Sequence, residues 1–109
     1  MVIRKSPKEE GWELENRVER ILISLQNGEQ INSHIRFSRN SREDQMGWDF
    51  EVRVGVITER FGVTTDSSRA HKSLARGINN LYFPIWIKDG EIARTILDLF
   101  KPSVSATAS

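Results

Sequence analysis

The sequence predicts a small α/β domain with elements in the order helix, three strands, helix, strand, helix (αβββαβα). Three observations support this prediction. Apolar residues recur at helical spacing near both ends of the chain, residues 50–64 alternate between apolar and polar side chains, and glycines separate the segments. A strand meander flanked by helices is typical of an α+β fold, or of a three-layer sandwich around a mixed sheet of about four strands.

The first expected element is an amphipathic helix over residues 7–26. Ser6, Pro7 and Glu9 favour its start, because serine caps a helix, proline suits its first position and glutamate completes a capping box. Gly28 follows its end. One face carries a stripe of aliphatic residues, namely Leu14, Val18, Ile21, Leu22 and Leu25.

Three strands are expected next. Residues 31–38 alternate well enough to predict the first strand, and the polar residues 39–45 predict a loop. Residues 50–54 alternate between apolar and charged side chains, which is the period of a half-buried strand. Gly55 then predicts a tight turn, so residues 57–64 are expected to form a hairpin with the preceding strand.

A second helix is expected over residues 68–76, because Asp66 can cap its start and Gly77 can close its end. The apolar residues 81–87 predict a fourth strand. Pro84 cannot donate a ladder hydrogen bond, so this strand should have a free or irregular edge. Packing positions are expected for the three tryptophans, Trp12, Trp48 and Trp86.

A last helix should open at Asp89, carry apolar residues as far as Phe100 and stop at Pro102. We therefore expect one domain over residues 1–101 and a flexible tail over residues 102–109. Apolar side chains on both faces of the fourth strand indicate burial on both sides, or an exposed edge that pairs two copies as a homodimer.

The composition limits the function. Sixteen basic and fifteen acidic residues leave a net charge of +1, so any affinity for nucleic acid must come from a local basic patch. The chain contains no cysteine, which excludes disulfides and thiolate metal sites. Neither a membrane-spanning run nor an apolar secretion signal is recognisable, so the expected location is the cytoplasm.

Two motifs carry a resemblance to a known family. On the first helix the motif residues are Gly11, Glu15 and Val18. Around the second strand they are Asp44, Gly47, Trp48, Asp49, Phe50 and Val52. These residues resemble G-x3-E-x2-V and D-x3-G-[I/W]-D-F-x-V in small members of the PD-(D/E)xK restriction-endonuclease-like superfamily. The resemblance implies a three-layer α/β/α restriction-endonuclease-like core, built from a helix, a three-strand meander, a helix and a further strand.

The third family motif, Q-V-K-S-S, matches only at Val63. Gly62 stands where the family has Glu or Gln, and Thr64 stands where it has the catalytic Lys. The resemblance implies phosphodiester hydrolysis with Mg²⁺, and carboxylate oxygens are the ligands that Mg²⁺ prefers. Asp49 and Glu15 are the expected catalytic and metal-binding residues. Gly62 offers no ligand, and Thr64 offers no positive charge.

Helix geometry places Glu15 about 60° from the centre of the buried stripe, where its side chain can lean over the sheet. A basic row of Arg69, Lys72 and Arg76 on the second helix is the expected nucleic-acid-binding surface, although such rows are usually solvated faces. His71 lies at the border of the apolar face of that helix and is by default a boundary residue.

A weaker alternative site combines Glu51 and Arg53 with Asp44, in imitation of the E-x-K pattern. Arginine stays protonated and cannot act as a base. A structural pair between Arg60 and either Glu51 or Asp49, across the hairpin, is the preferred interpretation of these charges.

Three hypotheses of function remain open. The leading one is a degenerate nuclease-like protein with lost or weak hydrolysis that retains nucleic-acid binding. The second is an active Mg²⁺-dependent DNA endonuclease with a rearranged site. The third is a non-catalytic protein-interaction domain of a mobile-element or phage accessory protein.

Overall fold

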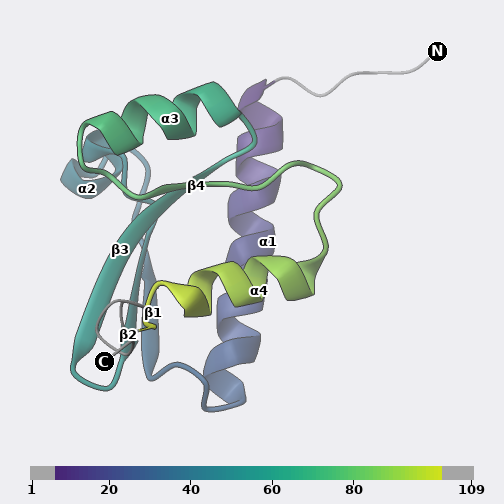
Figure 1. The fold of residues 1–109 in the computed structure, drawn as a ribbon, viewed down its shortest axis with the longest axis vertical. Coiled ribbons are helices and arrows are strands. Elements are labelled where there is room, and N and C mark those ends of the chain that lie inside the picture. The colour runs from purple at the N-terminus through teal and green to yellow at the C-terminus, as the bar shows by residue number, and fades with distance from the viewer. Residues whose placement is uncertain (1–6, 102–109) are drawn as a thin grey trace, which may run out of the picture.

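The structure, a computed structural model, describes residues 7–101 (Figure 1). Its elements are α1 (Pro7–Asn27), β1 (Ser33–Arg36), α2 (Arg42–Met46), β2 (Phe50–Val54), β3 (Ile57–Thr64), α3 (Ser67–Ala75), β4 (Asn80–Tyr82) and α4 (Asp89–Asp98). The expected cap at Ser6 and the expected tail over residues 102–109 lie outside the described residues. Between residues 7 and 101, no helix combines the length and the apolar character needed to cross a membrane.

The four strands form one open mixed sheet in the order β1-β2-β3-β4. β1 and β2 are antiparallel, as are β2 and β3, whereas β3 and β4 are parallel. Val54 pairs with Ile57 at the tight end of the β2–β3 hairpin. The expected mixed sheet of about four strands and the expected hairpin are therefore confirmed.

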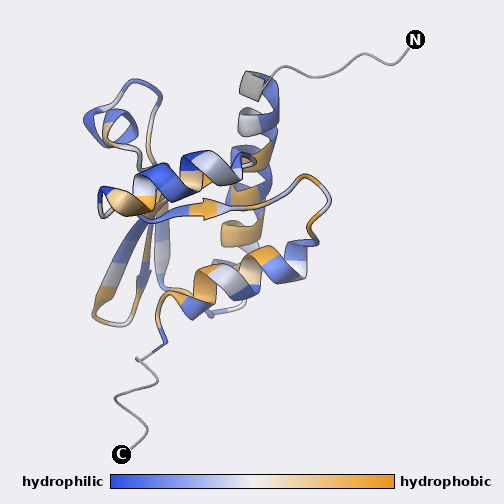
Figure 2. Cartoon of the chain, turned by 45° about the horizontal axis from the view of Figure 1, so that its top comes forward, coloured by the Kyte–Doolittle hydropathy of each residue, from blue (hydrophilic) through white to orange (hydrophobic). Residues whose placement is uncertain are grey.

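The core lies between α1, α4 and one face of the sheet. Val18 and Leu22 on α1 are fully buried, as are Phe50 on β2 and Phe61 on β3. The two phenylalanine rings stack with their centroids 5.7 Å apart. Ile92 and the neighbouring apolar residues of α4 complete this cluster, and Figure 2 shows apolar residues where α1 and α4 meet. Burial of each such side chain contributes about 1.5–3 kcal/mol.

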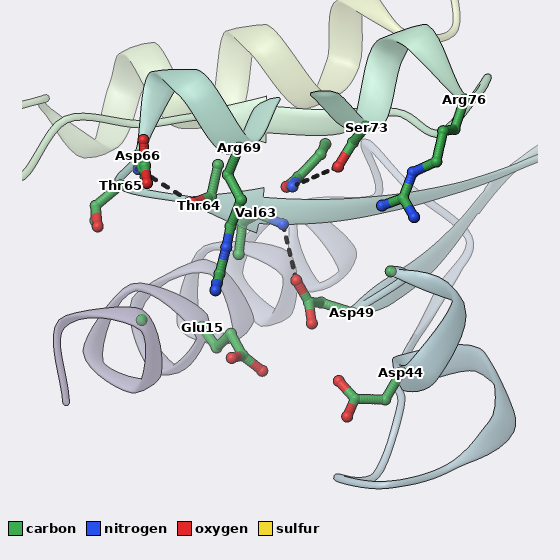
Figure 3. A pocket seen from close by; sticks show the side chains of 13 residues that line it. Glu15, Asp44, Asp49, Val63, Thr64, Thr65, Asp66, Arg69, Ser73 and Arg76 are labelled. Atoms are coloured by element: carbon green, nitrogen blue, oxygen red, sulfur yellow. Dashed lines mark hydrogen bonds between the residues drawn. The ribbon is translucent and has the colours of Figure 1, made fainter. Parts of the chain in front are cut away.

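Side chains at the C-terminal end of β3 alternate between the two faces of the sheet. Phe61 and Val63 join the core cluster with α1. Gly62 and Thr64, at the alternate positions, point to the other face, against which α3 packs. This alternation brings α1 and α3 to the same end of β3 from two directions, as Figure 3 shows.

Residues 39–45 were expected to form a loop, and this expectation is wrong for residues 42–45, which belong to α2. The Ser41 side chain caps α2 by accepting a hydrogen bond from the Asp44 amide (3.2 Å). Gly47 ends it with a left-handed φ of 103°. α2 buries no residue, so it leaves no apolar periodicity in the sequence. β1 is also shorter than the expected strand over residues 31–38.

The expected fourth strand over residues 81–87 is wrong in most of its length, since β4 comprises only Asn80–Tyr82. Phe83 still donates to the Thr64 carbonyl (2.8 Å), and Pro84 then ends the ladder. The chain turns away from the sheet, which leaves Ile85 and Trp86 exposed.

The packing role expected for Trp86 is also wrong, because 77% of this residue is exposed. Trp12 and Trp48 are half-buried, in keeping with packing positions. The homodimer expected through residues 81–87 stays a prediction, which sedimentation analysis can test.

Candidate functional site

A cleft of about 730 Å³ opens where α1, α2, the end of β3 and α3 meet (Figure 3). Its lining residues are Gly11, Glu15, Asp44, Gly47, Asp49, Val63, Thr64, Thr65, Asp66, Arg69, Ser73, Arg76 and Asn80. The cleft therefore brings together most of the site residues expected from the sequence. Lys72 does not line it, and both Lys72 and His71 are exposed on α3.

Asp49 lies immediately before β2 and is fixed from β3. Its Oδ2 accepts a hydrogen bond from the backbone N–H of Val63 (2.8 Å). Burial of the carboxyl group raises the pKa of Asp49 to about 7, and repulsion from Glu15 and Asp44 adds to the increase. The Val63 hydrogen bond and the Arg36 guanidinium lower this pKa, but they do not outweigh the burial.

Glu15 approaches the same space from α1. Burial raises the pKa of Glu15, although the positive charge of Arg36 opposes the increase. The two groups form a long ion pair, with 3.7 Å between Arg36 Nη2 and Glu15 Oε1. Arg36 also donates to Asn16 (2.8 Å) and pairs with Glu19 (3.3 Å), so its charge is shared along α1.

Sequence reasoning missed Arg36 and Arg39 as parts of the site. Arg36 pairs with Phe50, the residue after Asp49, so finding it required the register of β1 against β2, which the sequence pattern does not give. The Arg39 guanidinium lies 3.3 Å from the centroid of the Trp12 ring and lowers the pKa of Glu15. Nothing in the sequence pattern indicated that a residue of this loop would reach α1.

Asp44 supplies a third carboxylate from α2. Its Oδ2 accepts a hydrogen bond from the Asn40 amide (3.0 Å), which ties the group to the preceding loop. Figure 3 shows its side chain facing the space between Glu15 and Asp49. The three acids repel one another through this space, and the repulsion raises the pKa values of both Glu15 and Asp49.

These acids could hold a divalent cation only with few protein ligands. Within residues 7–101 no three Asp, Glu, His or Cys side chains stand close enough together to form a metal-binding group. Glu15 and Asp49 are the two carboxylates that would hold Mg²⁺, which commonly binds one or two carboxylates and keeps several waters. A bound Mg²⁺ would neutralise phosphate charge and acidify a water.

The backbone around Gly62 leaves no room for a side chain, and so none for the carboxylate that the resembling motif carries at this position. A Cβ atom at this position would lie 2.3 Å from the carbonyl oxygen of Gly47 and 3.1 Å from Asn80 Oδ1. The first of these clashes is with backbone, which cannot rotate away. The Gly62 N–H also donates to the Asn79 carbonyl (2.7 Å), so the strand is held in place there.

Thr64 has a structural role of its own. It is buried, and its Oγ1 accepts a hydrogen bond from the Asp66 amide (3.0 Å), which stabilises the turn into α3. Asp66 in turn caps α3 by accepting from the Ser68 amide (2.9 Å), as expected. Among the described residues, no lysine or histidine lines the cleft.

Two arginines of α3 face the acids. Arg69 lies on α3, and Arg76 is the residue that caps its C-terminal end. Figure 3 shows both side chains extending from this helix toward the side of the cleft that holds Glu15 and Asp49. In the part of the chain that the structure describes, neither arginine is within 4.0 Å of a carboxylate. Positive and negative groups therefore face each other across the cleft without touching.

The alternative site built on Glu51 and Arg53 is not assembled, because neither residue lines the cleft. Arg53 instead donates to the Gly55 carbonyl (3.1 Å). Glu51 pairs with Arg60 across the hairpin (2.9 Å), which confirms the expected structural pair. The Arg60 guanidinium also lies 5.2 Å from the Trp48 ring centroid, at the distance of a cation–π contact.

Comparison of the chain with protein-family models, curated proteins and solved structures finds no match.

Proposed function

We propose that this protein is a degenerate PD-(D/E)xK nuclease-like protein that binds nucleic acid in the cleft and has lost or weak hydrolysis. One observation carries the proposal. Glu15 and Asp49 face Arg69 and Arg76 across a single cleft, and the lysine expected for catalysis is replaced by Thr64.

The element order supports the fold assignment within this proposal. α1, the β1–β3 meander, α3 and β4 follow one another as the restriction-endonuclease-like core requires, with α2 inserted after β1 and α4 appended. α1 and α3 approach the sheet from its two sides, in keeping with a three-layer α/β/α arrangement.

The charges of the cleft support binding of a phosphodiester. A guanidinium group donates two parallel hydrogen bonds to a phosphate, and Arg69 and Arg76 are not occupied by carboxylates of the described chain. A phosphate placed between these arginines and the acids would still be repelled by Glu15 and Asp49. A divalent cation shared by the two carboxylates would remove that repulsion, so we expect binding to be stronger with Mg²⁺.

The same geometry argues against efficient hydrolysis. Arginine cannot take a proton from water at neutral pH, and the Thr64 hydroxyl is engaged with the Asp66 amide. The crowding around Gly62 excludes a third carboxylate from that position. Loss of a positioned acid or base typically lowers a rate by about 10²–10⁴-fold.

One observation favours the second candidate, an active Mg²⁺-dependent endonuclease with a rearranged site. The pKa of Asp49 is raised to about 7, and a general base works best when its pKa is near the operating pH. In that case Asp49 would accept a proton in catalysis, and Glu15 and Asp44 would hold the cation.

The experiment that separates the candidates titrates Mg²⁺ and Mn²⁺ against labelled single-stranded, duplex and branched DNA, and measures cleavage and binding together. We expect salt-sensitive binding with weak or no cleavage. Metal-dependent cleavage that Asp49→Asn abolishes would establish the active candidate instead. Absence of any salt-sensitive binding would refute the proposed function and leave the protein-interaction hypothesis.

A further inference from the structure

We infer that the cleft accepts one unpaired strand of nucleic acid in preference to a duplex, with the strand lying between α3 and the acids. The inference rests on the proposed function, because it names the class of ligand for the same site. Three features of the described residues support it: the size of the cleft, the two arginines of α3 and its C-terminal end that line the cleft, and two arginine–tryptophan contacts next to lining residues in the sequence.

The cleft has the volume of a pocket for one small ligand, which is too little to enclose a duplex. Its volume of about 730 Å³ equals a cube about 9 Å on a side, within the range of about 300–1,000 Å³ for pockets that enclose one small ligand. The major groove of B-DNA alone is about 12 Å wide, so a duplex can only lie across the rim. Val63 and Thr64, which line the cleft beside Asp49, are buried.

The α3 arginines point into the cleft rather than outward along the helix. Arg69 and Arg76 line it, whereas Lys72, which lies between them in the sequence, does not. If a duplex rested its backbone on the outer face of α3, we would expect it to contact Arg69, Lys72 and Arg76 together. The two arginines are seven residues apart, which is about 10.5 Å of backbone rise along a helix axis, so their guanidinium groups can contact different phosphates of one strand.

Two tryptophans are sequence neighbours of cleft-lining residues, although neither lines the cleft itself. Trp12 follows Gly11, and Trp48 lies between Gly47 and Asp49. Each ring contacts an exposed arginine, with Arg39 over Trp12 at 3.3 Å and Arg60 over Trp48 at 5.2 Å. Unpaired bases stack on aromatic rings and on guanidinium planes, whereas bases inside a duplex are already covered by their neighbours.

Fluorescence anisotropy with a short labelled DNA strand, the same strand annealed to its complement, and the RNA strand of equal sequence tests the inference. The measurements use the full chain with Ca²⁺ in place of Mg²⁺, over a series of salt concentrations. We expect the single strand to bind at least about tenfold more tightly than the duplex, a difference of about 1.4 kcal/mol. The ratio of the DNA affinity to the RNA affinity then shows whether the cleft prefers deoxyribose or ribose.

Single substitutions give a second test. Arg69→Ala and Arg76→Ala should each weaken single-strand binding severalfold and reduce the salt slope by about 0.7 for each phosphate that the variant leaves unneutralised. Arg94→Ala is the matched control, because Arg94 is an exposed arginine on α4 that does not line the cleft. It should leave binding unchanged. Thermal unfolding of each variant checks that the fold is intact.

Two results would overturn the inference in distinguishable ways. Duplex binding that equals or exceeds single-strand binding, and still depends on Arg69 and Arg76, would refute the inference and leave the proposed function standing. Failure of both DNA forms and of RNA to bind would refute the proposed function and the inference together.

Discussion

The carbonyl oxygen of Gly47 lies where the side chain of residue 62 would begin, 2.3 Å from the position of a Cβ atom on Gly62. This close approach of two backbone segments explains why position 62 requires glycine. A carboxylate side chain at this position is excluded by the path of the chain, so introducing one would require movement of the α2–β2 connection.

Gly62→Ala should therefore lower the free energy of unfolding by about 2–3 kcal/mol, the upper range for forcing an extra carbon into a packed site. Urea denaturation measures this change. Gly90→Ala is the matched control, because a Cβ atom at Gly90 meets nothing within 4 Å and alanine favours a helix. Equal stability of Gly62→Ala and the unchanged protein would contradict the close approach.

Stability should fall as the pH rises from about 4 to about 7 because of Asp49. Its folded-state pKa is raised from 3.8 to about 7, so the folded protein binds more protons than the unfolded chain in this interval. The stabilisation from protonated Asp49 is fully present below the pKa of this group in the unfolded chain. It is lost as the pH rises through the pKa of Asp49 in the folded protein. Glu15, whose pKa is also raised, acts in the same direction.

Urea denaturation of the unchanged protein and of Asp49→Asn, at about pH 5 and about pH 8, measures this effect. The unchanged protein should lose more stability between the two conditions than the variant, by an amount on the order of a few kcal/mol. Asparagine can still accept the Val63 hydrogen bond, so the comparison isolates the charge. Parallel behaviour of the two proteins would contradict the assignment.

Mg²⁺ should raise the melting temperature at about pH 8 more than at about pH 5, because protons compete with the cation for Glu15 and Asp49. Differential scanning calorimetry with and without Mg²⁺ measures the shift. Asp49→Asn and Glu15→Gln should each reduce it, whereas Glu91→Gln, at an exposed position on α4, should not. A full shift retained by both cleft variants would place the cation elsewhere.

Arg36→Gln should raise the pKa of Asp49 above about 7, since the Arg36 guanidinium opposes the effect of burial. The pKa of Glu15 should increase as well, because Arg36 is the positively charged group that lowers this pKa most. Nuclear magnetic resonance titration of the side-chain carboxyl carbons measures both values. Unchanged titration curves would show that Arg36 does not act on the cleft.

Elements that bury a regular set of side chains could be predicted from the sequence. The α1 stripe around Val18 and Leu22 and the alternation around Phe50 and Phe61 each reflect one buried face. α2 could not be predicted in this way, because it buries no residue and depends on the Ser41 cap. β4 ended early because Phe83 turns into the core and Pro84 ends the ladder.

The candidate site could be predicted where a motif or a helical period marked its residues. Glu15 and Asp49 were expected from the two resembling motifs, Arg69 and Arg76 from their spacing on α3, and the structure brings all four into one cleft. Arg36 was missed, because its position depends on the register of β1 against β2. The crowding at Gly62 involves a carbonyl group fifteen positions earlier in the chain, and local sequence patterns contain no signal for such an approach.

The central claim is that Glu15, Asp49, Arg69 and Arg76 form one nucleic-acid-binding cleft that no longer hydrolyses its ligand efficiently. The most direct test measures binding and cleavage of labelled DNA together across Mg²⁺ and salt titrations, for the unchanged protein, Asp49→Asn and the double variant of Arg69→Ala with Arg76→Ala. We predict binding that weakens steeply with salt and with removal of the arginines, with little or no cleavage. Cleavage abolished by Asp49→Asn, or binding unaffected by the double variant, would contradict the claim.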